Sequence, residues 1–193
     1  MGFLKQFFGH KKPSKSADQG HYLPEEKKPV EISFVNNFID RGGKFIYCEN
    51  SSATQFYFNQ ILEENGWQRH DVGSNSSVLS SFFNLIKVDT PPKALIMHCE
   101  YLVANKGALL ICNRQIQDKK LSELPENLII VAKSTDFIND VSEAMTAINR
   151  KYKDNLPTNI TTLNAFDPTK ENDFLSYGGN SKHLYLLVQE VNQ

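Results

Sequence analysis

The sequence predicts an α/β fold: a three-layer α/β/α, Rossmann-like domain with a mostly parallel sheet. Short apolar runs of strand length alternate with segments whose apolar residues have helical spacing. This alternation is typical of parallel strands joined by crossover helices. The run 128–132 is apolar throughout, which indicates a central strand covered on both faces. With 193 residues, 40% of them hydrophobic, the chain is long enough for one domain with a sizeable core.

The first half carries the clearest alternation of elements. Residues 31–41 place their apolar side chains on one helical face, and the pair Gly42-Gly43 follows as a stop signal. We expect a strand over 44–48 directly after it. The next elements expected are a helix capped by Ser51 or Ser52, a strand over 67–72, a short helix over 75–84 and a strand over 85–88.

The second half is richer in strands. A long helix is expected over 136–152, because Ile138, Val141, Met145, Ile148 and Tyr152 recur at helical spacing. The stretch 99–106 is expected to link two strands. The strands expected in this half cover residues 94–98, 107–112, 128–132, 160–163 and 184–188.

Charge divides the chain into a tail and a body. Residues 1–29 are predicted to be a basic, flexible tail and 30–193 a single domain, because prolines and polar residues dominate the tail and residues 1–16 contain four lysines and no acid. The net charge of −1 predicts no nucleic-acid partner. Residues 3–8 have a short amphipathic pattern, which could contact an anionic membrane surface, dock on a partner or pack on the domain itself.

The three cysteines, Cys48, Cys99 and Cys112, lie in apolar runs and are predicted to be buried, reduced thiols. Cys99 follows His98, but neighbours on a strand point to opposite faces, so this pair is poorly placed for thiol catalysis. Three cysteines cannot hold an iron–sulfur cluster by themselves. No apolar run is long enough to span a bilayer and no secretory signal is evident, so a cytoplasmic location is expected.

Motifs for common cofactors are missing from the sequence. No GxGxxG follows a strand, and no GxxxxGK[ST], HExxH or GxSxG is present. The five histidines are scattered, without the spacing of a metal site. We therefore expect neither a cofactor nor a metal.

Two segments carry residues suited to ligand binding. The segment 100–107 ends in a turn at a strand end, where ligands bind in open α/β sheets, and the segment 177–182 could form an anion-binding nest. Each has a plain alternative. The first could be a hairpin turn, because Asn-Lys-Gly is ordinary turn chemistry, and the second a flexible loop into the last strand. The binding site for a small anionic metabolite is predicted to contain Asn105, Lys106, Gly107, Gly178, Gly179 and Lys182.

The second half resembles a known family. The run from Glu100 through Asn105, Lys106 and Gly107 to Leu110 is similar to the signature of the LUD (lactate-utilisation) domain family: an acidic residue, an apolar pair, then Ala-Glu-Thr-Gly-Thr. The segment 121–132, LSELPENLIIVA, resembles a strand of the same family. The resemblance covers roughly residues 30–190 and is greatest to short members of the lactate-utilisation protein C type.

The resemblance implies a fold like that of the NagB/RpiA/CoA-transferase group and a role in lactate oxidation beside two iron–sulfur partner proteins. Asn105 stands where the family has Glu, and Lys106 and Ala108 stand where it has threonines. An amide cannot exchange the proton that a catalytic carboxylate would. Glu100 keeps the upstream acidic position, and Glu171 falls near the later one, so these two are the candidate catalytic carboxylates.

Three functions follow from these observations. The first is an accessory or small-ligand-binding component of lactate utilisation without catalytic activity of its own. The second is an enzyme of the CoA-transferase and sugar-phosphate isomerase superfamily that uses Glu100 or Glu171. The third is an interaction module that its basic tail brings to a membrane or a complex.

Overall fold

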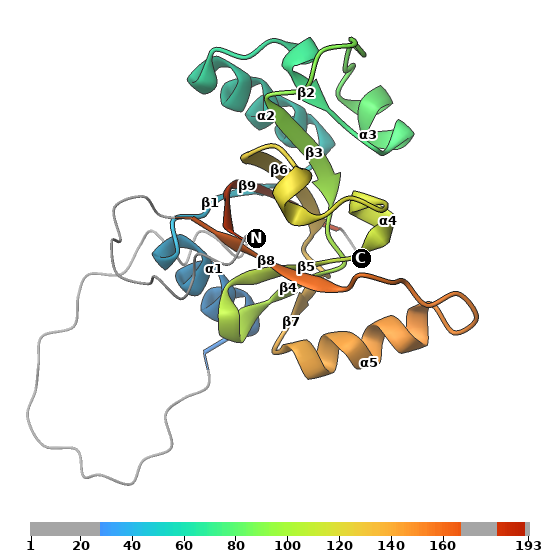
Figure 1. Ribbon diagram of the computed structural model, residues 1–193. Helices are drawn as coiled ribbons and strands as arrows, with labels where there is room; N and C mark the ends of the chain where they lie inside the picture. Colours follow the sequence, from blue (N-terminus) through green and yellow to red (C-terminus); the bar gives the residue numbers. More distant parts are fainter. Residues whose placement is uncertain (1–27, 167–180, 192–193) are drawn as a thin grey trace, which may run out of the picture.

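A five-stranded parallel sheet forms the centre of the molecule in the computed structural model, which describes residues 28–166 and 181–191. The strand order is β2-β3-β6-β9-β1 (Figure 1). The strands are β1 (Lys44–Cys48), β2 (Val72–Gly73), β3 (Ala94–His98), β6 (Asn127–Lys133) and β9 (Ser181–Gln189).

A second, smaller sheet has the order β8-β5-β4-β7. Its strands are β4 (Tyr101–Val103), β5 (Ala108–Ile111), β7 (Phe137–Ile138) and β8 (Thr161–Ala165). β4 and β5 form an antiparallel hairpin through the 3₁₀ turn Ala104–Lys106. β8 pairs antiparallel with β5 and parallel with β9, so it joins the two sheets.

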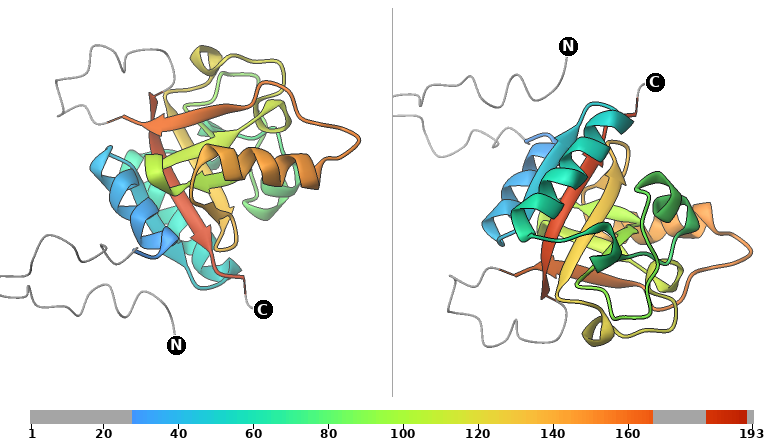
Figure 2. Two further views of the ribbon diagram at one scale, coloured as in Figure 1. Left: turned by 90° about the horizontal axis from the view of Figure 1, so that it is seen from below. Right: turned by 90° about the horizontal axis from the view of Figure 1, so that it is seen from above.

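Helices cover both sheets. Their bounds are α1 (Val30–Asp40), α2 (Ser51–Asn65), α3 (Ser77–Phe82), α4 (Asn113–Ile116) and α5 (Val141–Lys151). One face of the parallel sheet packs on α2 and α3, and the other packs on α1 and the small sheet. The outer face of the small sheet packs on α5 (Figure 2). The predicted fold class is therefore confirmed, with the small sheet as an addition.

Strand β6 shows how the sequence builds these layers. Leu128 and Ile130 belong to the core on the α1 side, whereas Ile129 and Val131 belong to the core on the α2 side. All four side chains are buried. Alternate residues of a strand point to opposite faces, so a strand covered on both faces must be apolar at every position.

Several predicted boundaries differ from the observed ones. The Asp140 side chain accepts a hydrogen bond from the Glu143 backbone N–H, so α5 begins at Val141 rather than at 136. Residues 137–138 pair instead with β4. The strand predicted over 85–88 is absent; Ile86 and Val88 lie exposed in a connection. Apart from Lys28 and Pro29, the predicted tail 1–29 lies outside the described residues.

Within the described ranges, no helix has both the length and the apolar character needed to cross a membrane.

Candidate functional site

A buried carboxylate, that of Glu100, lies between the parallel sheet and the small sheet. Glu100 lies one residue beyond Cys99 in the connection from β3 to β4 and directly precedes β4, and its backbone N–H donates to the Leu110 carbonyl at 2.7 Å. This pairing directs its side chain into the protein, where Glu100 is only 3% exposed. A buried acid needs hydrogen bonds and a counter-charge to compensate for lost hydration, so donors and a cation are expected around Glu100.

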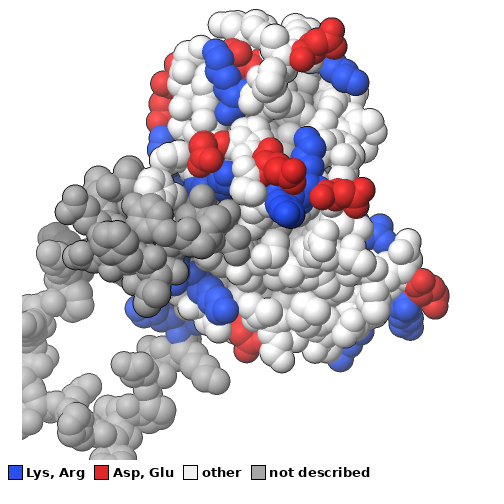
Figure 3. All heavy atoms as spheres, in the orientation of Figure 1, with Lys and Arg blue, Asp and Glu red and all other residues white. Residues whose placement is uncertain are grey.

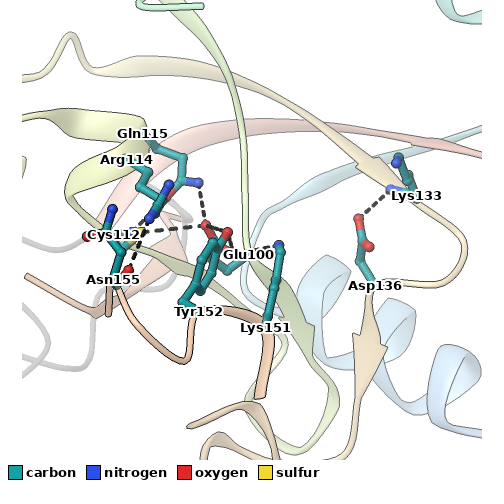
Figure 4. Close-up of polar contacts among 9 residues, drawn as sticks. All are labelled: Glu100, Cys112, Arg114, Gln115, Lys133, Asp136, Lys151, Tyr152 and Asn155. Atoms are coloured by element: carbon teal, nitrogen blue, oxygen red, sulfur yellow. Dashed lines mark hydrogen bonds and ion pairs between the residues drawn. The ribbon is translucent and has the colours of Figure 1, made fainter. Parts of the chain in front are cut away.

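Four side chains donate to this carboxylate. Gln115 Nε2 is 2.8 Å from Oε1, and Lys151 Nζ is 2.9 Å from Oε2. The Tyr152 hydroxyl lies 2.9 Å from Oε2 and 3.1 Å from Oε1, and Cys112 Sγ lies 3.5 Å from Oε1 (Figure 4). The donors come from the end of β5, from α4 and from the end of α5. Glu100 therefore ties three elements to the β3–β4 connection.

The surrounding donors keep Glu100 ionised. Burial alone would raise the pKa of this carboxyl, but the hydrogen bonds from Gln115, Lys151 and Tyr152 outweigh it and lower the pKa below its usual value. The same contacts raise the pKa of Lys151 against the effect of its burial. The pair thus carries opposite charges at neutral pH.

The hydrogen-bonding capacity of Glu100 is almost fully used. A carboxylate offers about four lone-pair directions, and five contacts occupy the two oxygens of this one. The Glu100 side chain is only 2% exposed, so little of the carboxylate is open to a substrate. The geometry suits a carboxylate that positions helices rather than one that exchanges protons with a substrate.

Arg114 completes the cluster on its exposed side. Its guanidinium lies 4.3 Å from the centre of the Tyr152 ring and donates to the Asn155 carbonyl at 3.0 Å. A cation over an aromatic face is attracted by the ring quadrupole. Arg114 therefore holds the end of α5 against α4, in parallel with Glu100.

The neighbouring thiol and acid are not activated. Burial raises the pKa of the Cys99 thiol well above its usual value, and the charges of Asp136 and Glu100 raise it further. Asp136 Oδ2 accepts from the Lys133 backbone N–H at 2.7 Å (Figure 4), and burial raises the pKa of Asp136. A thiol held in the protonated form is a weak nucleophile, so this arrangement does not provide thiol catalysis.

The predicted Asn105-Lys106-Gly107 segment is the hairpin turn between β4 and β5. Asn105 and Lys106 are exposed, and the Asn105 N–H donates to the Asn139 carbonyl at 3.0 Å. Gly107 has a positive φ of 55°, and a Cβ at this position would collide with the α1 backbone at Asn37. The close approach that glycine allows here is therefore to the chain itself.

Lys182 lies at the start of β9, which is the amino edge of the parallel sheet and not its carboxyl edge. It is 3% exposed; its ammonium contacts Glu126 Oε1 at 3.0 Å and the Leu124 carbonyl at 3.2 Å. The strand registers bring the start of β9, which contains Lys182, and the 105–107 turn to the same end of β8. Glu171, Gly178 and Gly179 lie outside the described residues.

Sequence reasoning missed all four donors to Glu100, namely Cys112, Gln115, Lys151 and Tyr152. The sequence did contain one signal, because an acid between two apolar strands requires buried partners. Nothing in the spacing indicates which distant residues supply them. No group of three or more His, Cys, Asp or Glu residues suited to a metal occurs among residues 28–166 and 181–191.

The fold and this cluster define the chain as an α/β protein with a Rossmann-like parallel sheet and a structural buried carboxylate. A family model, the LUD domain, matches residues 91–188, so the chain belongs to the LUD-domain family. The fold is similar to the crystal structure of a DUF162 family protein from Deinococcus radiodurans, with a TM-score of 0.58. That chain is 14% identical, and the match covers 83% of this chain and 96% of the other. No curated protein matches.

Proposed function

We propose that the chain is an accessory or small-ligand-binding component of lactate utilisation that performs no catalysis of its own. The state of Glu100 carries this proposal: the carboxylate at the family's acidic position is buried, ionised and engaged by four donor side chains. It acts as a structural anchor. The link to lactate rests on membership of the LUD-domain family.

The chemistry of proton transfer argues against Glu100 as an acid or base. A general acid–base group works best with a pKa near the operating pH and within hydrogen-bond reach of the substrate. The pKa of Glu100 is lowered, and its oxygens face Gln115, Lys151 and Tyr152. An enzymatic role for Glu100 would require this network to be broken first.

The proposed partners are iron–sulfur proteins of lactate oxidation, and the proposed location is the cytoplasm. The described cysteines, Cys48, Cys99 and Cys112, are buried free thiols far from the spacing of a cluster site. Electron transfer would therefore take place in the partners, and this chain would bind a ligand or hold the complex together.

Lactate oxidation in extracts tests this proposal. A strain lacking the protein should lose lactate-dependent reduction of an artificial electron acceptor, and adding the purified chain should restore it. The purified chain alone should show no turnover. Glu100→Gln should restore the rate in proportion to its folded fraction, because the residue positions other elements.

Two outcomes would contradict the proposal. An unchanged rate in extracts of the deletion strain would remove the lactate role. Turnover by the purified chain alone, abolished in a folded Glu100→Gln protein, would make Glu100 a catalytic residue and support the enzyme alternative.

A further inference from the structure

A hollow of about 480 Å³ lies beside α4, on the surface between the segment after α4 and the start of β8. Its volume is within the range of small-molecule binding sites. All its lining residues are described: Ile116, Asp118, Lys119, Lys120, Leu121, Ser122, Asn159, Ile160 and Thr161.

The walls of the hollow are fixed by hydrogen bonds outside it. Asn113 and Thr158 are joined twice: the Asn113 N–H donates to the Thr158 carbonyl at 2.9 Å, and the Thr158 N–H donates to Asn113 Oδ1 at 3.0 Å. The Glu100–Gln115 contact holds the middle of α4, whose last residue, Ile116, lines the hollow. The buried carboxylate thus positions one wall of this surface site.

Backbone strain is concentrated at the hollow. Asn159 in its lining has a φ of 53°, and Gln117, between two lining residues, has a φ of 57° with a ψ of −133°. The conformation of Gln117 is one that residues with a side chain rarely adopt, whereas asparagine tolerates a positive φ more readily. Such strain is retained where surrounding contacts impose it, and it often marks binding sites.

The lining combines an apolar floor with a charged rim. Ile116 and Leu121 are buried and Ile160 is half-buried, whereas Lys119 and Lys120 are exposed. In the space-filling view, side chains of both signs gather in the middle of the molecule (Figure 3). With Asp118 as the single acid in the lining, the two lysines leave a net charge of +1.

Neither rim lysine forms an ion pair within the described part of the chain. The Lys120 backbone N–H does have a partner, the Glu123 carboxylate. The ammonium groups of Lys119 and Lys120 can therefore bind a ligand without breaking an ion pair to a carboxylate of the described residues.

We propose that this hollow binds an organic monocarboxylate with a short apolar body. Lys119 and Lys120 receive the carboxylate, the side chains of Ile116, Leu121 and Ile160 cover the apolar body, and Ser122 or Thr161 can bond a hydroxyl on it. The net charge of +1 matches a monoanion. This assignment rests on the proposed binding function and places its ligand away from Lys106 and Lys182.

Methyl-detected NMR on the full chain tests this site with simple probes. Hexanoate should shift the methyl signals of Ile116, Leu121 and Ile160, and should bind about fivefold more tightly than neutral hexanamide because of its charge. Acetate should bind at least about tenfold more weakly than hexanoate, because it lacks the apolar body. The Lys119→Gln/Lys120→Gln protein should bind hexanoate and hexanamide equally.

Lys87→Gln is the matched control, since it removes an exposed lysine from the connection after α3, outside the lining of the hollow, and should leave hexanoate binding unchanged. Equal affinity for hexanoate and hexanamide in the unmodified protein would overturn the proposal, as would shifts confined to other methyl groups. If the hollow fails this test while the purified chain still restores lactate oxidation in extracts, the function stands and its ligand binds elsewhere.

Discussion

Lys151 Nζ lies 2.9 Å from Glu100 Oε2, although 51 positions separate the two residues in the chain. The contact joins the end of α5 to the connection between β3 and β4. Glu100 is almost fully buried whereas Lys151 remains half exposed, so removing the acid and removing the lysine are unequal changes.

Glu100→Gln should lower the free energy of unfolding by about 2 kcal/mol, because it removes charge-assisted bonds and leaves buried donors without a charged acceptor. Urea denaturation measures this directly. Glu64→Gln is the control, since its ion pair with Lys44 is exposed on both sides and should contribute less than about 1 kcal/mol. Equal losses in the two variants would show that burial does not decide the effect.

Protonation of Glu100 should lower the stability of the folded protein at acidic pH. Its pKa is lower in the folded than in the unfolded chain, so the unfolded chain takes up the proton first as the pH falls. The stabilisation is complete above the ordinary carboxyl pKa of 4.5 and is lost as the pH drops through the lowered value. Denaturation between pH 3 and 7 should give a shallower pH dependence for Glu100→Gln than for the unmodified protein.

Gly107→Ala should prevent folding or cost more than about 3 kcal/mol. Its φ is positive, and the added Cβ would meet the backbone of α1 at Asn37 and Phe38. Gly66→Ala is a matched control, because Gly66 also has a positive φ but nothing lies within 4 Å of the added atom. It should cost about 1 kcal/mol. Thermal unfolding followed by circular dichroism compares the two.

Replacing the two lysines that were predicted to bind a ligand should have different effects on the free energy of unfolding. Lys182→Ala should cost about 2 kcal/mol, since it removes a buried side chain together with its bonds to Leu124 and Glu126. Lys106→Ala, in an exposed turn, should change stability by less than about 0.5 kcal/mol. If urea denaturation showed no change in the free energy of unfolding for Lys182→Ala, the anchoring role of Lys182 would be contradicted.

Periodicity predicted the large elements well because burial in each of them is one-sided or complete. The strands 44–48 and 94–98 have the expected bounds. The second helix ends at Asn65, but its N-cap is Asn50 rather than Ser51 or Ser52, so it begins at Ser51. One error falls where a short segment satisfies two patterns. Ile138 continues the apolar stripe of the helix predicted over 136–152, yet the Asp140 cap assigns it to a strand.

The site was less accessible to sequence reasoning. Glu100 and the 105–107 turn were found because strand ends are recognisable in the sequence. Lys151 lay among other basic residues near the end of a helix, where a solvated cation is the normal expectation. Which of these basic residues contacts Glu100 depends on how α5 crosses the small sheet. The spacing of residues along the chain does not reveal this crossing.

The pairing of β1 with β9 has a consequence for the boundaries of the family match. The match begins at residue 91, whereas β1, at 44–48, pairs with the second half of β9, from Lys44–Tyr185 to Cys48–Gln189. A fragment cut to the matched region would leave β9 as a bare sheet edge, able to recruit strands from other molecules. Expressed alone, that fragment should self-associate, because residues 185–189 of β9 would lack the partner that β1 provides.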